Sequence, residues 1–524
     1  ATAQRRRALE QPDPDLMRKL TIAQLAITQL YVDSVDQKKL VENAINGMLS
    51  KLDPHSAYSN PEETRRMNEP LEGIGVQFNM LEDTLVVIQT IAKGPSQKAG
   101  ITNGDRIVSV DGRPIAGVKL ERDSIMKLLR GPKGTKVSLG IVRPSVNGVL
   151  TFVVTRDKIP MNTLDAAYMI APGVGYIRLD RFGATSGKEV REAIARLQKQ
   201  GMKDLLFDLE SNGGGYLGAA VEVASQFLNP KDLVVYTEGR ATPKQVFEAQ
   251  SGGLFRKGRL IVLVDEFSAS AAEIVTGAVQ DHDRALVVGR RTFGKGLVQR
   301  PIDLPDGSMI RLTTSHYFTP SGRCIQKPFK PGGIAAYEQD MLTRYQHGEF
   351  FSQDSIKHTG PAYHTNNGRL VYGGGGITPD IFVPEDTSDV TSYYKEAAMR
   401  GLILQYAFKY TDENRQTLKK YTEMKPLSEY LTGRNLVNDF ANYAEKNGLR
   451  RRNNLINKSH ALLENYIYSR IIYNILDEQA WNQYLNRNDD MIKAAEKVLN
   501  SGEAFPKAPA KKGHSTKKQQ NRTT

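Results

Sequence analysis

The sequence predicts a multidomain α/β (α+β) protein, because both its length and its changes of hydrophobic pattern divide it. At 524 residues the chain is too long for one ordinary core. Segments with helical spacing at both ends enclose a run of short β-branched segments and a stretch in which strands alternate with helices. The expected regions are 1–70, 71–157, 158–387, 388–500 and a basic disordered tail over 501–524.

Composition excludes several classes of protein. Apolar residues make up 40% and charged residues 25% of the chain, as in a soluble globular protein, and no run of about 18 apolar residues predicts a membrane span. The single cysteine, Cys324, excludes an internal disulfide. Eight scattered histidines without paired ligand spacing predict no metal site, and no cofactor is expected.

The net charge of +13 suggests nucleic acid or an acidic surface as a partner. Much of this charge is local, since residues 507–524 hold six Lys or Arg and no acid. This segment lacks the interleaved aromatic residues on which bases stack, so a solvated tail is favoured over a nucleic-acid arm.

Two helices are expected over residues 15–51, where apolar residues recur at helical spacing until Asp53-Pro54 ends the second. They form either a hairpin that packs on the main body or a dimer contact. Residues 71–157 then predict a compact strand-rich module with two brief helices. Its expected strands are 84–90, 106–110, 136–142 and 150–155, and its helices 96–99 and 120–129.

Strands and helices alternate over residues 160–385, and the strands are almost continuously apolar, which indicates a partly parallel sheet covered by helices. Sites in such sheets lie at the carboxyl ends of strands. Two motif-like loops, 212–215 and 268–270, fall at such ends. Residues 388–500 are helical in pattern and contain no constellation that predicts chemistry.

Ser270 is the candidate nucleophile. It follows the apolar strand that ends at Val264-Asp265, and small residues around it allow a tight turn into a helix. The N–H groups and positive dipole at a helix N-terminus favour a developing oxyanion. A serine in this place is also a common helix cap, and Ser268 competes for the catalytic role.

Lys295 is the candidate base, because Gly294 and Gly296 let the backbone around it approach other elements closely. A lysine base must lose its proton near neutral pH, which requires desolvation in an apolar setting. Gln299 could orient the lysine if this segment is helical. For a peptidase, the Asn212-Gly-Gly-Gly215 loop would donate one N–H to the oxyanion and Ala271 the other.

Motifs in a fixed order along residues 40–385 resemble the C-terminal processing peptidases, tail-specific serine proteases with a PDZ domain inserted before a Ser/Lys core. The matching motifs are Leu52-Asp-Pro-His-Ser-Ala-Tyr58, Gly73-Ile-Gly-Val-Gln-Phe78, Asp105-Arg-Ile-Val-Ser-Val-Asp-Gly112, Arg130-Gly-Pro-Lys-Gly-Thr135, Thr319-Pro-Ser-Gly-Arg-Cys-Ile-Gln326 and Gly376-Ile-Thr-Pro-Asp380.

This resemblance implies a serine endopeptidase that recognises protein C-termini through the PDZ domain and forms an acyl-enzyme. It implies catalytic Ser270, Lys295 and Gln299 and oxyanion donors Gly214 and Ala271. The tail would bind by β-addition at Gly73, Ile74, Gly75, Val76 and Arg130, its carboxylate held by backbone N–H groups.

Three rival interpretations stay open: a PDZ adaptor with an inactive core, a Ser/His/Asp hydrolase with His55, His282 or His316 as base, and nucleic-acid binding through the tail. The N-terminus has no apolar signal region, so the protein is either cytoplasmic or has lost its signal peptide. The resemblance implies a periplasmic or otherwise extracytoplasmic bacterial setting, with a homodimer and an adaptor protein as partners besides the substrates.

Overall fold

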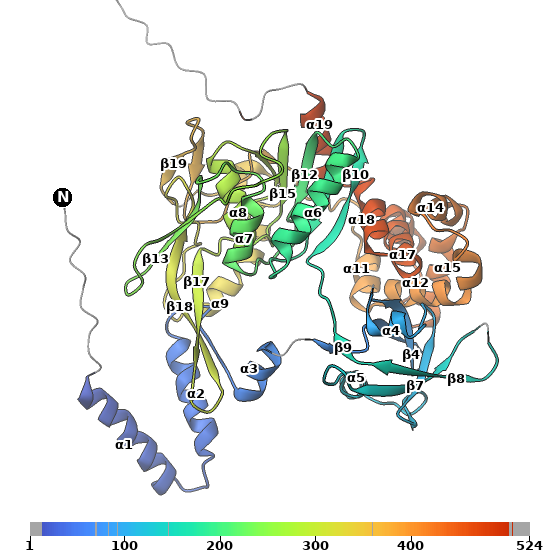
Figure 1. Ribbon diagram of the computed structural model, residues 1–524, viewed down its shortest axis with the longest axis horizontal. Coiled ribbons are helices and arrows are strands. Elements are labelled where there is room, and N and C mark those ends of the chain that lie inside the picture. The colour runs from blue at the N-terminus through green and yellow to red at the C-terminus, as the bar shows by residue number, and fades with distance from the viewer. Residues whose placement is uncertain are drawn as a thin grey trace, which may run out of the picture.

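The computed structural model describes residues 13–68, 71–81, 83–91, 93–144, 146–358, 360–501 and 506 (Figure 1). Nearly all of the expected basic tail lies outside the described residues. The chain forms an N-terminal arm, an inserted module of mainly strands, a mixed α/β core and a helical module. The multidomain α/β (α+β) fold class is thereby confirmed. No described helix is both long enough and apolar enough to cross a lipid bilayer.

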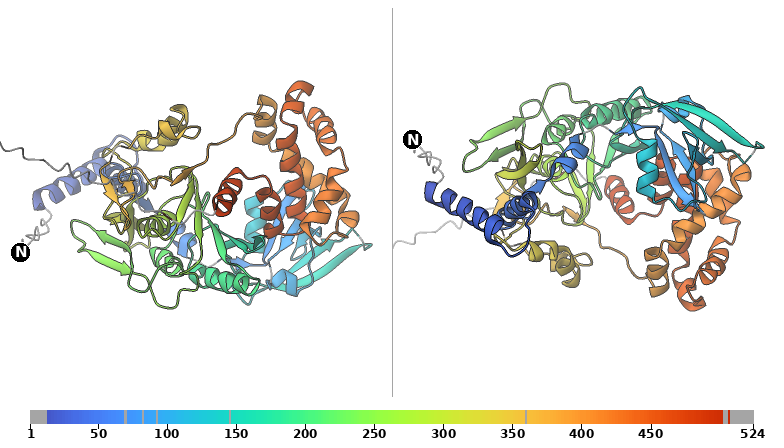
Figure 2. Two further views of the ribbon diagram at one scale, coloured as in Figure 1. Left: turned by 90° about the horizontal axis from the view of Figure 1, so that it is seen from above. Right: turned by 90° about the horizontal axis from the view of Figure 1, so that it is seen from below.

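The N-terminal arm consists of α1 (Pro14–Leu30), α2 (Gln37–Leu49), β1 (Ala57–Ser59) and α3 (Pro61–Asn68). Asp13 caps α1 by accepting a hydrogen bond from the N–H of Asp15, but no residue of α1 is buried. Figure 2 shows this helix projecting from the body. The expectation of a hairpin packed on the main body is therefore wrong for α1, whose apolar side chains face outward instead.

The inserted module is an antiparallel sheet in the order β3-β4-β5-β7-β8, with β6 beside β5. Its elements are β3 (Val76–Leu81), β4 (Thr84–Thr90), α4 (Pro95–Lys98), β5 (Arg106–Val110), β6 (Arg113–Pro114), α5 (Arg122–Leu129), β7 (Lys136–Val142) and β8 (Val149–Thr155). Strand β3 is an edge strand, so one row of its backbone groups is open to a further strand.

A two-stranded neck joins the inserted module to the rest of the chain. Strand β2 (Glu72–Gly73) enters the module and pairs antiparallel with β9 (Asp157–Lys158), which leaves it. The module is thus inserted between the N-terminal arm and the core.

The core contains a six-stranded sheet in the order β10-β11-β12-β15-β16-β21, parallel except for its first pair. Its strands are β10 (Leu164–Ala171), β11 (Val174–Leu179), β12 (Asp204–Asp208), β15 (Leu260–Val264), β16 (Leu286–Gly289) and β21 (Ile381–Phe382). Both faces are covered, as expected for parallel strands. Helices α6 (Ser186–Lys199), α7 (Leu217–Ala224) and α8 (Ala271–Asp281) pack on one face, and α19 (Asp490–Asn500) packs on the other.

A second sheet of the core ties the N-terminal arm to the core, because β1 pairs with β18 and β18 also pairs with β17. Its strands are β1, β13 (Leu233–Glu238), β14 (Gln245–Glu248), β17 (Leu297–Asp303) and β18 (Met309–Phe318). Smaller elements complete the core: α9 (Ile334–Glu338), α10 (Asp340–Gln346), the 3-10 turn η1 (Gln353–Ser355), β19 (Ala362–His364) and β20 (Leu370–Tyr372).

The helical module has an apolar core of its own, to which Ile403, Phe440 and Ile467 belong. Figures 1 and 2 show it beside the inserted module. Its helices are α11 (Ser392–Met399), α12 (Leu402–Glu413), α13 (Arg415–Leu418), α14 (Met424–Thr432), α15 (Leu436–Lys446), α16 (Asn453–Lys458), α17 (His460–Ile475) and α18 (Glu478–Asn486).

Candidate active site

Ser270 lies at the N-terminus of α8, at the carboxyl end of the sheet, and its backbone is held at φ 58° and ψ −114°. A left-handed φ is costly for a residue with a Cβ, and such strain concentrates at functional sites. The neighbouring Ser268 is fully buried, and its hydroxyl donates to the carbonyl of Leu209 at 2.8 Å while accepting from the N–H of Asp265. Ser270 is only partly buried, so its side chain has solvent access that Ser268 lacks.

The glycine loop after β12 touches the serine turn directly. A Cβ added at Gly214 would stand 2.8 Å from the Cβ of Ser270 and 2.8 Å from the nitrogen of Ala271. Only glycine, here with φ +94°, fits so close. The N–H of Gly214 donates to Oδ1 of Asn212 at 2.8 Å. The N–H of Gly214 could therefore stabilise an oxyanion only after its hydrogen bond to Asn212 is broken.

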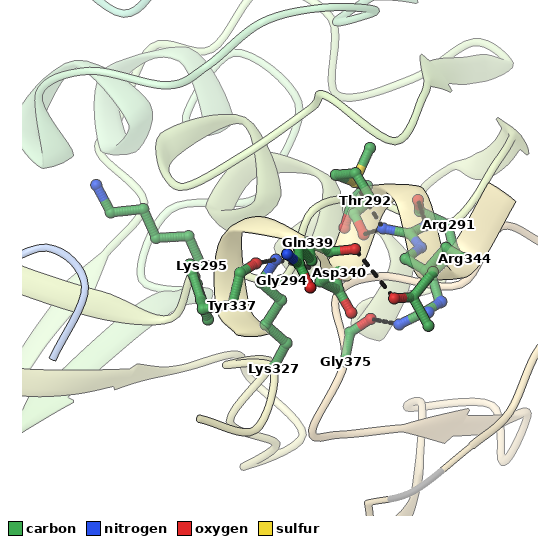
Figure 3. Close-up of polar contacts among 12 residues, drawn as sticks. Arg291, Thr292, Gly294, Lys295, Lys327, Tyr337, Gln339, Asp340, Arg344 and Gly375 are labelled. Atoms are coloured by element: carbon green, nitrogen blue, oxygen red, sulfur yellow. Dashed lines mark hydrogen bonds and ion pairs between the residues drawn. The ribbon is translucent and has the colours of Figure 1, made fainter. Parts of the chain in front are cut away.

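Lys295 lies between Gly294 and Gly296, just before β17 begins at Leu297. Burial lowers the pKa of Lys295, and the positive charge of Arg311 lowers it further, against smaller opposing effects of Glu273 and Asp53. This direction is the one that a lysine base requires. In Figure 3 its side chain extends away from the polar cluster around Lys327, and among the described residues its Nζ makes no hydrogen bond or ion pair.

Glu273 links the serine turn to the lysine segment, although sequence reasoning assigned it no role. Its fully buried carboxylate accepts hydrogen bonds from the N–H of Ser270 (2.8 Å), the N–H of Lys295 (2.9 Å), the N–H of Gly294 (2.8 Å) and the hydroxyl of Thr292 (2.5 Å). Burial, only partly offset by these bonds, raises the pKa of Glu273 to about 7. The Ser-x-x-Glu spacing of a capping box was the signal that could have identified it.

Gln299 lies on strand β17, so the helical segment through which it could have oriented Lys295 is not present there. Its Nε2 donates to the hydroxyl of Thr313 at 3.2 Å, and that hydroxyl donates to Asp53 at 2.9 Å. Asp53 also accepts a hydrogen bond from the hydroxyl of Ser56 at 2.6 Å. The Asp-Pro-His-Ser motif of the N-terminal arm is thus linked to Gln299 through Thr313. With Nε2 engaged, the carbonyl oxygen of Gln299 is left as its acceptor.

The three candidate histidines differ in their positions. His282 follows the far end of α8, about 18 Å along the helix from Ser270 at 1.5 Å per residue, and bonds the carbonyl of Leu233. His316 lies on β18 beside Cys324. His55 bonds the hydroxyl of Tyr337 at 2.8 Å, and burial followed by the charge of Lys295 lowers the pKa of His55 to about 4.

A second buried lysine lies near the site. Lys327 is 4% exposed, pairs with Asp340 at 3.0 Å and places its ammonium 4.0 Å from the ring centroids of Phe293 and Tyr337 (Figure 3). Burial lowers the pKa of Lys327, although Asp340 opposes this shift. Its charge is thus already satisfied by a carboxylate and two rings, in contrast to Lys295.

The residues expected to hold a substrate tail come together in the inserted module. Gly73, Ile74, Gly75, Val76 and Arg130 all line one cavity of about 810 Å³. The cavity runs between the start of edge strand β3 and the C-terminal end of α5, where an added strand would lie.

Comparison with known proteins fits this architecture. Residues 173–335 match peptidase family S41, residues 73–152 match the PDZ domain, and residues 1–64 match the N-terminal domain of the activating protease CtpB. Residues 393–477 match a family of unknown function, DUF8443. A PDZ domain joined to a peptidase core of this kind places the protein in the class of serine-type peptidases.

The relatives narrow the class further. The carboxy-terminal-processing protease of Bartonella bacilliformis is 39% identical over 56% of this chain and 69% of its own length. The carboxy-terminal processing protease CtpB of Bacillus subtilis is 34% identical over 62% of this chain and 69% of its own. The chain belongs to the carboxy-terminal processing proteases of family S41, which confirms the resemblance noted in its motifs. A solved photosystem II D1 C-terminal processing protease is 26% identical, with a TM-score of 0.36 over 71% of this chain and 94% of that one.

Proposed function

We propose that the protein is an endopeptidase that binds protein substrates by their C-terminal tails through the PDZ domain and cleaves them with a Ser270–Lys295 dyad. The observation that carries this proposal is the Glu273 carboxylate, which accepts hydrogen bonds from the backbone N–H groups of both Ser270 and Lys295. A buried link of this kind fixes a nucleophile and a base relative to each other.

In the proposed reaction, neutral Lys295 takes the Oγ proton of Ser270 while Oγ bonds to the scissile carbonyl carbon. The N–H groups of Gly214 and Ala271 stabilise the oxyanion. Collapse breaks the C–N bond, the leaving amine receives the proton from Lys295, and an acyl-enzyme remains. Lys295 then takes a proton from a water molecule, which attacks the ester carbonyl carbon, and Lys295 gives that proton to Oγ of Ser270 as the ester C–O bond breaks. Gln299 orients the amine of Lys295 through its free carbonyl oxygen.

The test is proteolysis of a reporter protein that carries an unstructured C-terminal tail. We expect Ser270→Ala to lose at least about 1,000-fold in rate, since no other hydroxyl takes the place of the nucleophile. Ser251→Ala, which removes the same hydroxyl from an exposed serine, is the matched control and should cleave normally. Cleavage by Ser270→Ala at the wild-type rate would refute the assignment of Ser270, whereas a wild-type protein that cleaves no tailed reporter would favour the adaptor interpretation of an inactive core.

A histidine base is the second candidate, because His55 is close enough for the charge of Lys295 to lower its pKa. A pKa of about 4 makes His55 a weak base at neutral pH. Full activity of Lys295→Ala combined with an inactive His55→Ala would favour the histidine. The reverse pattern supports the lysine.

A homodimer formed through α1 is part of the proposal, since Leu16, Leu20 and Leu30 are 62%, 55% and 82% exposed on a helix with no buried residue. Light scattering of the full chain tests it: Leu20→Glu should yield monomers, while Lys19→Glu on the same helix should not. A wild-type chain that is monomeric at micromolar concentration would contradict this part.

We also propose a periplasmic or otherwise extracytoplasmic setting, with a signal peptide removed and an adaptor protein presenting substrates. The support is the bacterial origin of the processing proteases that match the chain. Fractionation of the source cells tests the location. Capture on immobilised Ser270→Ala, followed by sequencing of the captured C-termini, separates substrates from an adaptor.

A further inference from the structure

The cavity of the PDZ domain is not built by that domain alone. Its lining continues from β3 and α5 to the exit segment around Met161 and Asn162, and then to the corner between α17 and α18. That corner, residues 476–479, belongs to the helical module and contributes Leu476, Glu478 and Gln479 to the lining. Three separate parts of the chain therefore enclose one space.

The corner is attached to the strand that would pair with a tail. The hydroxyl of Tyr473 donates to Oε1 of Gln77 at 2.6 Å, and Nε2 of Gln89 donates to the carbonyl of Tyr473 at 2.7 Å. Gln77 and Gln89 are directly opposite each other in the β3–β4 pair. The helical module thus makes hydrogen bonds to the edge strand and to the strand paired with it.

Further contacts fix the corner in place from both sides. Asp412 of α12 pairs with Arg106 of the PDZ domain, and both are largely withdrawn from solvent. On the core side, Nδ2 of Asn486 donates to the hydroxyl of Tyr168 at 2.8 Å, and Oε1 of Gln479 accepts from the N–H of Ala167. Since these ties involve the PDZ domain and the core alike, the corner is a fixed wall of the cavity.

The wall is acidic. Asp165, Asp180, Asp477 and Glu478 line this end of the cavity, and Arg181 also lines it, 3.6 Å from Asp180. Arg178 lies 3.8 Å from Asp165, but its guanidinium is paired more closely with Asp208, at 2.6 Å. Burial raises the pKa of Asp165 to about 7, and the charges of Glu478 and Asp180 contribute to that rise. Burial, with Asp180, likewise raises the pKa of Glu478. Neighbouring carboxyls that repel each other in this way gain stability when a cation lies among them.

We propose that the α17–α18 corner forms part of the tail-binding site and selects substrates that carry a lysine or arginine upstream of their C-terminal carboxylate. The carboxylate binds at the Gly73–Val76 loop beside Arg130, and the basic side chain lies against Glu478 and Asp165. This inference rests on the proposed tail recognition, and it gives the helical module a role in specificity.

The experiment measures binding of fluorescent peptides to full-length Ser270→Ala protein, which should bind tails without cleaving them. One tail sequence is synthesised with serine, lysine or glutamate at each of the five positions before the terminal residue. At one or two adjacent positions we expect lysine to bind about tenfold more tightly than serine, and glutamate more weakly than serine. Higher ionic strength should reduce this preference.

Two variants test whether the preference for lysine depends on Glu478 and Asp165. Glu478→Gln and Asp165→Asn, each added to Ser270→Ala, should remove most of the preference for lysine while leaving the affinity for the serine peptide within about twofold. Glu445→Gln makes the same change on α15, at an exposed position of the same module, and should keep the preference. Circular dichroism of each variant checks that the fold is retained.

The outcomes separate the inference from the proposed function. Equal binding of the lysine and serine peptides, or a preference that survives both Glu478→Gln and Asp165→Asn, overturns the inference. Equal binding of free-acid and C-terminally amidated peptides, or no binding of any peptide, overturns tail recognition itself and the inference with it. A carboxylate-dependent affinity without preference for lysine leaves the proposed function intact and refutes only the acidic wall.

Discussion

The proposed catalytic region and the proposed tail-binding cavity are built in opposite ways. One fully buried carboxylate, Glu273, joins the serine turn to the lysine segment within a single domain. The cavity instead needs the PDZ domain, the segment that leaves it and the helical module, joined by partly exposed side chains such as Gln77 and Tyr473. The chemistry therefore depends on local packing, while recognition depends on how separate parts of the chain are placed.

The largest expected effect is a loss of catalysis that leaves tail binding unchanged. Lys295→Ala should lower kcat by about 1,000- to 10,000-fold, because the base is lost, while the affinity for a tail peptide stays unchanged. Lys257→Ala, an exposed lysine of the core, is the control. A Lys295→Ala protein that loses peptide affinity as well would show that the two regions are not independent.

The second prediction tests whether the buried carboxylate organises the catalytic region. Glu273→Gln should lower kcat by about 10- to 100-fold and the free energy of unfolding by about 1–3 kcal/mol, because an amide cannot satisfy all of the donors around it. Glu192→Gln on the exposed face of α6 should change neither. Denaturant titration and steady-state kinetics measure the two effects, and normal kcat in Glu273→Gln would contradict the organising role.

The third prediction affects the cavity alone. Tyr473→Phe removes the hydrogen bond to Gln77, and we expect KM for a tailed substrate to rise by up to about fivefold with kcat unchanged. Tyr443→Phe alters a tyrosine of the same module on α15, outside the cavity, and serves as the control. A fall in kcat with unchanged KM would contradict the assignment of Tyr473 to the cavity.

The smallest effect concerns the pH dependence of the catalytic region. Because the pKa of Lys295 is lowered, its neutral form becomes populated at a lower pH than that of a free lysine, and kcat/KM should rise with pH to a plateau. Arg311→Gln removes a positive charge that lowers this pKa, so the rise should move to higher pH and activity at pH 7 should fall about twofold. Arg300→Gln on β17 is the control, and an unmoved profile in Arg311→Gln would exclude this influence.

Sequence patterns predicted the features that depend on neighbours along the chain. The position of Ser270 between a strand and a helix, the glycine loop beside it and the order of the motifs all follow from local spacing. The four-residue spacing between Lys295 and Gln299 would bring the two together only on a helix. In the structure Gln299 instead lies on β17 and pairs with Thr313 on the adjacent strand β18.

Contacts between distant segments could not be predicted in this way. The bonds of Glu273 to Thr292 and Lys295 cross about twenty residues, and the contact of Tyr473 with Gln77 crosses almost 400. Periodicity reports which face of an element is apolar but not which partner covers it. The helical module therefore carried no functional signal in its sequence, although its corner lines the cavity.

The neck of the PDZ domain has a mechanical consequence. Gly73 pairs with Asp157 in the two-residue ladder that attaches the domain, and it also lines the cavity at the loop expected to hold a carboxylate. The proposed carboxylate-binding loop and the attachment of the domain thus share one backbone segment. A ligand that displaced Gly73 would also displace the ladder that joins the domain to the rest of the chain.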